Sequence, residues 1–309
     1  GGGLLEAIGM LLECMGWLSK GCSKLYAEEE ELFYRGLNVA VQVLSVAPAH
    51  DKLRGSTLIY LHRMVDCLGK GTFRIMPVTL REMLRNNDAK DASEVITLVN
   101  QVMSRYKEES RDVIMHVYEA ISECALTLLE SFGDQMTSQA SQEAREMRNL
   151  YKLWLQFIHT AHLHNLHAIF TLDAHVTRLQ GVVSSVIEGM RLIPEPAAAK
   201  MCVQVLSKMA SVWASEERNP IPGFRQFLLP SAGRACLACA CAPWLSSSDA
   251  QGYACYTELA LIQRTFYQIA GEEWCVLLVE QLLPDTGFDP DSARQFTAGL
   301  QGGGGKGFR

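Results

Sequence analysis

Apolar side chains recur along this chain at steps of three and four residues, and strict two-residue alternation is hard to find. The clearest example is the series Leu58, Leu61, Val65 and Leu68. This spacing places the side chains on one face of a helix. The same spacing returns in residues 95–106, 114–128, 147–157, 179–190, 202–212 and 256–269. A β-branched run at residues 181–187 is the best strand candidate, but it continues a helical stripe on both sides, so the pattern predicts an all-α fold.

Glycine, proline and short polar clusters interrupt this pattern at fairly even intervals and divide the helices into consecutive pairs. The pairs fall at residues 4–46, 50–86, 91–130, 141–190, 196–242 and 249–300. A length of about 40–50 residues per pair is typical of HEAT and armadillo repeats. Most apolar stripes cover a single face, which suits helices that stack in a row. We therefore predict a right-handed α-solenoid of about six HEAT-like helical hairpins, with an irregular helical bundle as the alternative.

Several predicted helices begin with residues that can cap them. A side-chain oxygen just before an apolar stripe can accept hydrogen bonds from the first free backbone N–H groups. The candidates for this role are Asp91 or Ser93, Ser141 and Asp249. Pro196 suits the first turn of a helix, where a missing N–H group costs no hydrogen bond.

The length of 309 residues would allow two compact domains, but the repeated pairs favour a single array. We expect residues 1–301 to form one helical-repeat arch. Residues 302–309 are glycine-rich and are expected to be a disordered tail. The chain begins Gly-Gly-Gly rather than with methionine, which suggests a fragment or an incomplete gene sequence.

Composition and charge narrow the possible functions. Hydrophobic residues make up 48% of the chain, enough to bury a core and to exclude wholesale disorder. The net charge of −6 gives no general attraction to nucleic acid, so contact with a polyanion would need a local basic face. Ten cysteines, mostly single residues inside apolar stretches, are typical of a reduced intracellular protein. No targeting segment and no run of 18 uncharged apolar residues is present, so we expect a soluble protein without membrane insertion.

Two clusters have the residue types of metal sites. His159, His162, His164 and His167, with His175 beyond, could grip a divalent ion, but they fall where a turn is expected and a partly exposed polar loop is the simpler interpretation. Cys236, Cys239 and Cys241 contain a CxxC pattern but lack a second pair, with Cys255 the one nearby candidate. Cysteines in alanine-rich helical sequence usually pack in the interior. We predict no metal and no cofactor.

Motifs of catalysis are equally scarce. The sequence contains no nucleophile elbow, phosphate-binding loop, dinucleotide fingerprint or HExxH motif. Cysteine and histidine both occur, but nothing in their spacing arranges a nucleophile beside a base. We predict that the chain is not an enzyme.

The distribution of basic residues carries the most functional information. In a solenoid, equivalent helices of successive repeats form one wall, so single basic residues per repeat can form a stripe that grips phosphates without reading bases. The candidates are Arg54, Arg63, Arg105, Lys107, Arg145, Arg148, Lys152, Lys200 and Lys208. Ordinary ion pairing, for example with Glu143 and Glu146, is the alternative for any single residue.

An ordered series of short segments resembles the Exportin-T family, the tRNA exportins of the importin-β (karyopherin) superfamily. The segments include LHRMVDCL (61–68), IMP (75–77), LVNQV (98–102), VIEG (186–189), LSKM (206–209) and QLLP (281–284). The resemblance is colinear over roughly residues 5–300, and it rests on the whole series because no single motif is diagnostic. The glycine-rich end departs from the helical, basic C-terminus of the family.

The resemblance implies the C-terminal third of a HEAT-repeat superhelix that binds tRNA together with Ran in its GTP form. Such a receptor carries tRNA through nuclear pores, where nuclear pore proteins are its partners, and shuttles between nucleus and cytoplasm. The main Ran surface of the family lies in N-terminal repeats that this sequence does not contain. The alternative is a HEAT-repeat scaffold, or a karyopherin for protein cargo, that binds no RNA.

Overall fold

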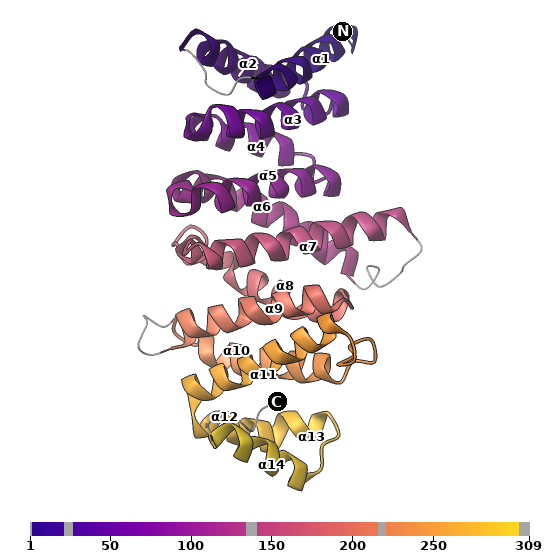
Figure 1. The fold of residues 1–309 in the computed structure, drawn as a ribbon, viewed down its shortest axis with the longest axis vertical. Helices are drawn as coiled ribbons and strands as arrows, with labels where there is room; N and C mark the ends of the chain where they lie inside the picture. The colour runs from indigo at the N-terminus through magenta and orange to yellow at the C-terminus, as the bar shows by residue number, and fades with distance from the viewer. Residues whose placement is uncertain (1, 22–26, 134–140, 216–220, 303–309) are drawn as a thin grey trace. The chain divides into compact units, whose positions relative to one another are not determined.

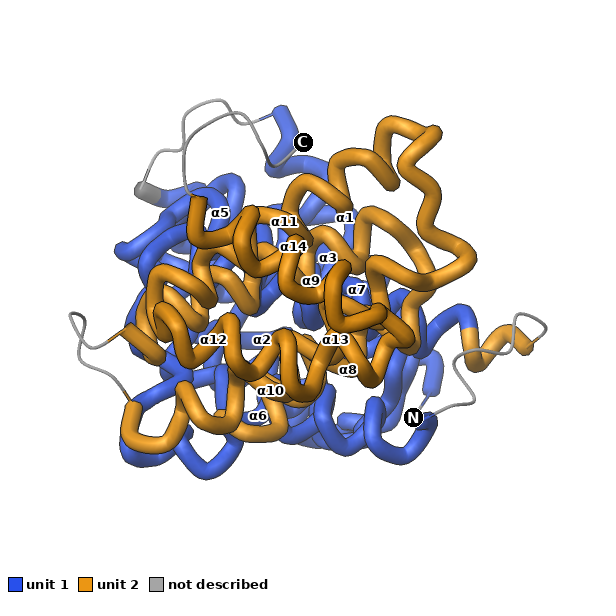
Figure 2. The backbone as a smooth tube through the Cα atoms, turned by 90° about the horizontal axis from the view of Figure 1, so that it is seen from below, with its two compact units in different colours: residues 1–133, 145–178 blue, residues 134–144, 179–309 orange. Residues whose placement is uncertain are grey.

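The protein was analysed as a computed structural model that describes residues 2–21, 27–133, 141–215 and 221–302. Within these residues all regular secondary structure is helical (Figure 1). The prediction of an all-α fold is confirmed. The chain divides into two compact units, residues 1–133 with 145–178 and residues 134–144 with 179–309 (Figure 2).

Unit 1 is built from two layers of helices. Its helices are α1 (Gly2–Leu18), α2 (Ala27–Val46), α3 (Asp51–Cys67), α4 (Met76–Leu84), α5 (Ala89–Tyr106), α6 (Arg111–Phe132) and α7 (Gln142–Leu163). Helices α1, α3, α5 and α7 follow one another in one layer, and α2, α4 and α6 follow one another in the second (Figure 1). Consecutive helices therefore alternate between layers, as in HEAT-type pairs.

The apolar stripes explain the layers, because each helix buries the face that its stripe predicts. On α5 the side chains of Val95, Leu98 and Val102 are fully buried. Burying one such side chain contributes about 1.5–3 kcal/mol. At the α6–α7 end of unit 1 the core is aromatic: Trp154 and Phe157 stack with ring centroids 5.5 Å apart, and Tyr118 meets Phe170 edge-on at 5.4 Å.

Unit 2 repeats the same construction. Its helices are α8 (Leu179–Leu192), α9 (Pro196–Met209), α10 (Phe224–Ala240), α11 (Ala250–Ala270), α12 (Glu272–Leu277), α13 (Leu283–Asp285) and α14 (Pro290–Gln301). Helix α8 packs beside α10, and α9 packs beside α11. Gly233 lets Trp274 approach the α10 backbone, since a Cβ at this position would lie 2.5 Å from the indole ring.

The observed pairs agree with the predicted ones, and one local prediction is wrong. Residues 181–187 lie inside α8, which confirms the helical interpretation of this segment. Helix α5 is capped by Asp88, whose Oδ1 accepts from the backbone N–H groups of Lys90 and Asp91 at 3.0 Å, and not by Asp91 or Ser93. The segment 88–93 offers three capping side chains, Asp88, Asp91 and Ser93, and the earliest of these begins the helix.

Three other helix starts are as predicted. Asp249 Oδ1 accepts from the N–H groups of Gln251 and Gly252 at 2.9 and 2.8 Å. Ser141 Oγ accepts from the N–H group of Ala144 at 3.0 Å, and Pro196 occupies the first turn of α9.

A single arch over residues 1–301 stays a prediction. Of the expected tail, residues 302–309, the structure describes only Gly302, and the rest lies outside the described residues. No described helix is both long and apolar enough to cross a membrane.

Candidate nucleic-acid interface

The basic candidates of unit 1 all come from one layer of helices. Arg54 and Arg63 lie on α3, Arg105 lies in the last turn of α5, Lys107 directly follows that helix, and the remaining three lie on α7. The layer of α2, α4 and α6 contributes none of them. In unit 2, Lys200 and Lys208 both lie on α9. The structure therefore brings seven of the nine predicted residues to one helix layer of a single unit.

Helix α7 carries the densest basic stripe. Arg145, Arg148 and Lys152 follow at steps of three and four residues, which places them on one face over about 10 Å of helix. Glu146 lies about 100° around the helix from Arg145, beside this face, and Glu143 lies on the opposite side of the helix. Arg145 is exposed, and Arg148 and Lys152 are half-buried. We call these three residues the α7 stripe.

Arg105 and Lys107 extend the basic character to the end of α5. Arg105 pairs with Asp66 on α3, and both side chains are nearly half exposed, at 46% and 44%. Exposed pairs of this kind contribute about 0–1 kcal/mol, so a phosphate can displace the carboxylate at small cost. Lys107 is exposed and adopts a left-handed backbone with φ of 49°. Arg105 therefore forms an ordinary ion pair, which was the alternative for each basic candidate. This pair is exposed enough for a phosphate to replace Asp66.

Arg63 lies where α3 meets α1. A Cβ at Gly16 on α1 would lie 3.4 Å from Arg63 Cγ, so the stem of the arginine covers the contact between these two helices. Long basic side chains commonly pack their stems on apolar surface in this way and leave the charged end near water. Arg63 is half-buried, in agreement with this arrangement.

Arg54 is the one candidate that the structure contradicts. Its side chain is only 3% exposed and pairs with Asp91, while its guanidinium donates to the carbonyl oxygens of Pro48 at 2.8 Å and Met83 at 2.6 Å. A buried guanidinium with these acceptors cannot reach a phosphate. Arg54 instead ties α3 to α4 and α5, and the spacing of basic residues could not reveal it because its partner lies 37 positions away.

In unit 2 the two candidates differ in exposure. Lys208 is exposed, whereas Lys200 is half-buried near the thiol of Cys255. They lie eight residues, or about 12 Å, apart along α9.

The histidine cluster is more buried than the sequence suggested. Helix α7 runs through His159 and His162 to Leu163, so the predicted turn begins later. The buried His162 ring stacks on Phe170 at 5.6 Å, and Nδ1 of the buried His175 lies 2.6 Å from the carbonyl oxygen of Ile169. Burial lowers the pKa of His167, with a smaller contribution from Arg111. The expectation of a polar loop is wrong for His162 and His175.

The cysteine cluster is structural, as expected, for two of its three members. Cys236 and Cys239 on α10 are buried together with Cys202 on α9 and Cys255 on α11, whereas Cys241 is exposed. Burial raises the pKa of the Cys202 thiol and raises that of Cys236 to about 12. In the described part of the chain no group of three or more histidine, cysteine or acidic residues is arranged to hold a metal ion.

Sequence reasoning missed one further surface feature, an aromatic groove between α11 and α14. It is lined on α11 by a second stripe that includes Tyr253, Leu261 and Arg264. A signal was present, because these residues also recur at helical steps. It was hidden by the stronger stripe of Leu259, Ile262 and the following core residues on the opposite face.

The paired helix layers define a HEAT-type helical-repeat protein. The Exportin-T family model matches residues 4–309, and the chain therefore belongs to the Exportin-T family.

Curated relatives agree with this family assignment. Exportin-T of Oryza sativa subsp. japonica is 28% identical over 283 residues, covering 90% of this chain and 29% of the rice protein. Exportin-T of Homo sapiens is 25% identical over 281 residues, and that of Arabidopsis thaliana 25% over 275, covering 91% and 88% of this chain. The chain spans less than a third of the length of each of these relatives, at 28–29%. The relatives are named as exportins, which are transport receptors rather than enzymes.

The buried Arg54 leads to a stability prediction. Arg54→Ala removes the partner of Asp91 and of two backbone carbonyls, and breaking a buried pair costs about 3–5 kcal/mol. We expect a loss of about 3 kcal/mol in the free energy of unfolding, measured by urea denaturation. Arg85→Ala is the matched control, because its pair with Glu82 is on the surface, and should cost less than about 1 kcal/mol. Equal losses of stability in both variants would contradict the conclusion that Arg54 is a buried structural residue.

Burial of the cysteines leads to a prediction about thiol reactivity. In native protein at pH 8, iodoacetamide should label Cys14 and Cys241, which are exposed, far faster than Cys202 and Cys236. Burial both blocks access and raises the two latter thiol pKa values, which leaves little reactive thiolate at this pH. Mass spectrometry of peptides from native and urea-unfolded samples measures the difference. Labelling of Cys202 at the rate of Cys241 in native protein would show that the cluster is open.

Proposed function

We propose that this chain is the cargo-binding part of a nuclear export receptor for tRNA. Membership in the Exportin-T family supports the transport role. The observation that carries the RNA-binding part is the α7 stripe, together with Arg63, Arg105 and Lys107 on the same helix layer of unit 1. An overall charge of −6 fits this role, because an acidic carrier repels unselected nucleic acid and binds cargo where basic side chains are gathered.

Recognition by shape and backbone suits a receptor that accepts many tRNAs. The major groove of A-form RNA is too deep and narrow for side chains to read the base edges. Arginine and lysine contacts to phosphate fix the position of the RNA and carry no direct sequence information. Basic residues spread over adjacent helices can contact phosphates at several points along a folded RNA, whereas a single pocket contacts only one point.

Ran in its GTP form is the proposed second ligand, with its main contact surface in repeats N-terminal to this chain. If tRNA and Ran-GTP favour the same conformation of the receptor, each raises the affinity for the other by the same factor. Hydrolysis of GTP then removes one ligand and releases the other. The receptor would contact nuclear pore proteins during passage and shuttle between nucleus and cytoplasm. The chain itself needs no catalytic residue for this cycle.

The α7 stripe is tested by its removal. We expect Arg145→Ala, Arg148→Ala and Lys152→Ala together to weaken tRNA binding at least about tenfold, because phosphate contacts are lost. The slope of log affinity against log salt concentration should fall by about 1 for each contact removed. Filter binding of tRNA over a series of salt concentrations measures both quantities.

A matched control changes the charge equally in the second layer of unit 1. Arg74 lies just before α4, Arg81 lies on it and Arg85 directly follows it, and all three are exposed, so replacing them with alanine also removes three positive charges. This control should bind tRNA as the unchanged chain does. Equal weakening in both triple variants would mean that only net charge matters. Absence of tRNA binding by the unchanged chain would favour the alternative, a scaffold or carrier for proteins.

A further inference from the structure

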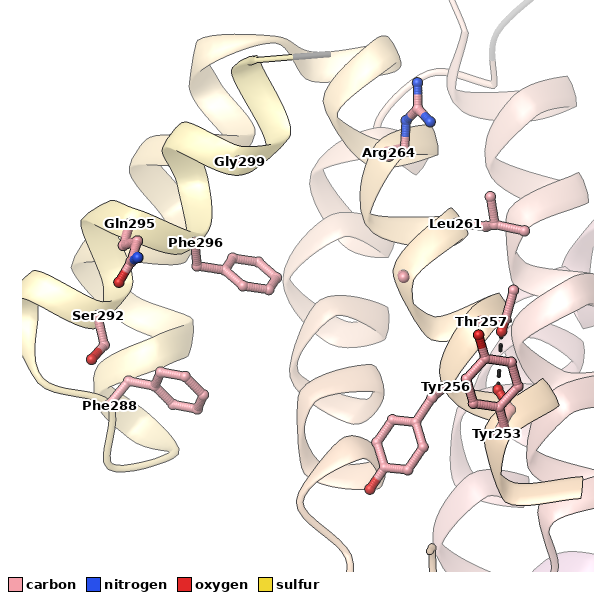
Figure 3. Close-up of a pocket in the computed structure, with 11 residues that line it drawn as sticks. Tyr253, Tyr256, Thr257, Leu261, Arg264, Phe288, Ser292, Gln295, Phe296 and Gly299 are labelled. Atoms are coloured by element: carbon pink, nitrogen blue, oxygen red, sulfur yellow. Dashed lines mark hydrogen bonds between the residues drawn. The ribbon is translucent and has the colours of Figure 1, made fainter. Parts of the chain in front are cut away.

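A groove lies between α11 and α14, entirely within unit 2 (Figure 3). Its volume is about 870 Å³, at the upper end of the range for sites that hold a small ligand or a few residues of peptide. Tyr253, Leu261, Arg264, Phe288 and Phe296 are among the residues that line it. None of these residues belongs to the basic candidates of the proposed tRNA interface.

The groove is formed by helix faces that the core does not use. On α11, Tyr253, Thr257, Leu261 and Arg264 recur at steps of four, four and three residues and form one stripe. The opposite face of α11 is buried through Cys255, Leu259 and Phe266. Helix α14 buries Ala293 and Leu300, and Phe296 lies at the edge of this same face, where it lines the groove. Helix α11 therefore carries apolar side chains on two sides, and α14 adds Phe296 to the groove.

Within the described part of unit 2, exposed large apolar side chains are concentrated at this groove. Tyr253 is 58% exposed, Leu261 49% and Phe288 40%. In the described part of unit 2, Val276 is the one other large apolar side chain that is equally open to solvent. Clustered exposed apolar surface with a polar rim marks a binding site more often than scattered single residues do. The aromatic rings of Phe288 and Phe296 point across the groove toward α11 (Figure 3).

The charge in the groove is at one end. Arg264 is the single charged residue among those that line it, and it is exposed. It lies eleven positions from Tyr253, or about 16 Å along α11. Figure 3 shows the tyrosine and Phe288 rings toward one end of the groove and Arg264 toward the other. A complementary ligand therefore carries an apolar group at one end and a negative charge at the other.

We propose that the α11–α14 groove binds a short acidic peptide segment of a partner protein. An aromatic or large aliphatic side chain of the segment sits among Tyr253, Phe288 and Phe296, and a carboxylate of the segment pairs with Arg264. An extended peptide rises about 3.3 Å per residue, so the two groups lie about five positions apart, with four residues between them. A carboxylate suits the planar guanidinium of arginine, which can donate two parallel hydrogen bonds to it.

A peptide fits this lining better than RNA does. Nucleic acid binding needs several cations to neutralise successive phosphates, and the groove offers one. Apolar and aromatic side chains make up most of the remaining wall, which is typical of a pocket for a peptide anchor. The groove thus differs from the α7 stripe in the chemistry of its side chains, and it lies on different helices.

The test uses the full chain and two fluorescein-labelled peptides of the sequence Trp-Ser-Ala-Ser-Ala followed by glutamate or lysine. We expect saturable binding of the glutamate peptide, at least about tenfold tighter than that of the lysine peptide. Arg264→Glu should reverse this preference, and Phe288→Ser should weaken binding of the glutamate peptide about tenfold. Both residues are exposed, so both variants should fold, which circular dichroism checks.

Arg191→Glu is the matched control, because it makes the same charge change at an exposed position on α8 of the same unit and should leave peptide binding unchanged. The proposal is overturned if neither peptide binds saturably at millimolar concentration, or if Arg264→Glu leaves the preference as it was. It is also overturned if Arg264→Glu weakens tRNA binding as strongly as loss of the α7 stripe. A concentration-dependent dimer that Leu261→Ser abolishes would assign the groove to a second copy of the chain instead.

Discussion

One-sided burial of helices is the interaction on which the rest of this structure depends. Each helix packs its apolar face against the neighbouring helix of its own layer and against its partner in the other layer. Side chains on the remaining face do not contribute to the core and are free to vary in charge. Where buried polar groups do occur, as at Arg54 and Asp91, they tie successive pairs together through specific hydrogen bonds.

This division of roles explains how one type of repeat can carry different surfaces. In unit 1 the outward positions of α3, α5 and α7 collect arginine and lysine, and the stem of Arg63 packs on α1 at the same time. In unit 2 the outward positions of α11 and α14 include the aromatic side chains of Tyr253, Tyr256 and Phe296. The same packing therefore presents the proposed phosphate-binding face in one unit and the proposed peptide groove in the other.

The fold was accessible from sequence because helical burial is periodic, and the six predicted pairs reappear with shifts of a few residues. What the sequence could not show depends on contacts between distant positions. Arg54 has the same local spacing as the other candidates, but its partner Asp91 is 37 positions away and takes it out of solvent. His162 looked like a loop residue, because its neighbour Phe170 comes into contact only once the chain has folded back. The groove was overlooked because α11 carries two apolar stripes, and the stronger one predicts the core.

The central claim is that the layer of α3, α5 and α7 faces the RNA. Acetylation of lysines in the presence and absence of tRNA, followed by mass spectrometry, tests it most directly. We predict that bound tRNA slows acetylation of Lys107 and Lys152. Lys70 should be acetylated at the same rate with and without tRNA. It is exposed beside Glu109, in the segment between α3 and α4. Protection of Lys70 with Lys107 and Lys152 unprotected would contradict the account.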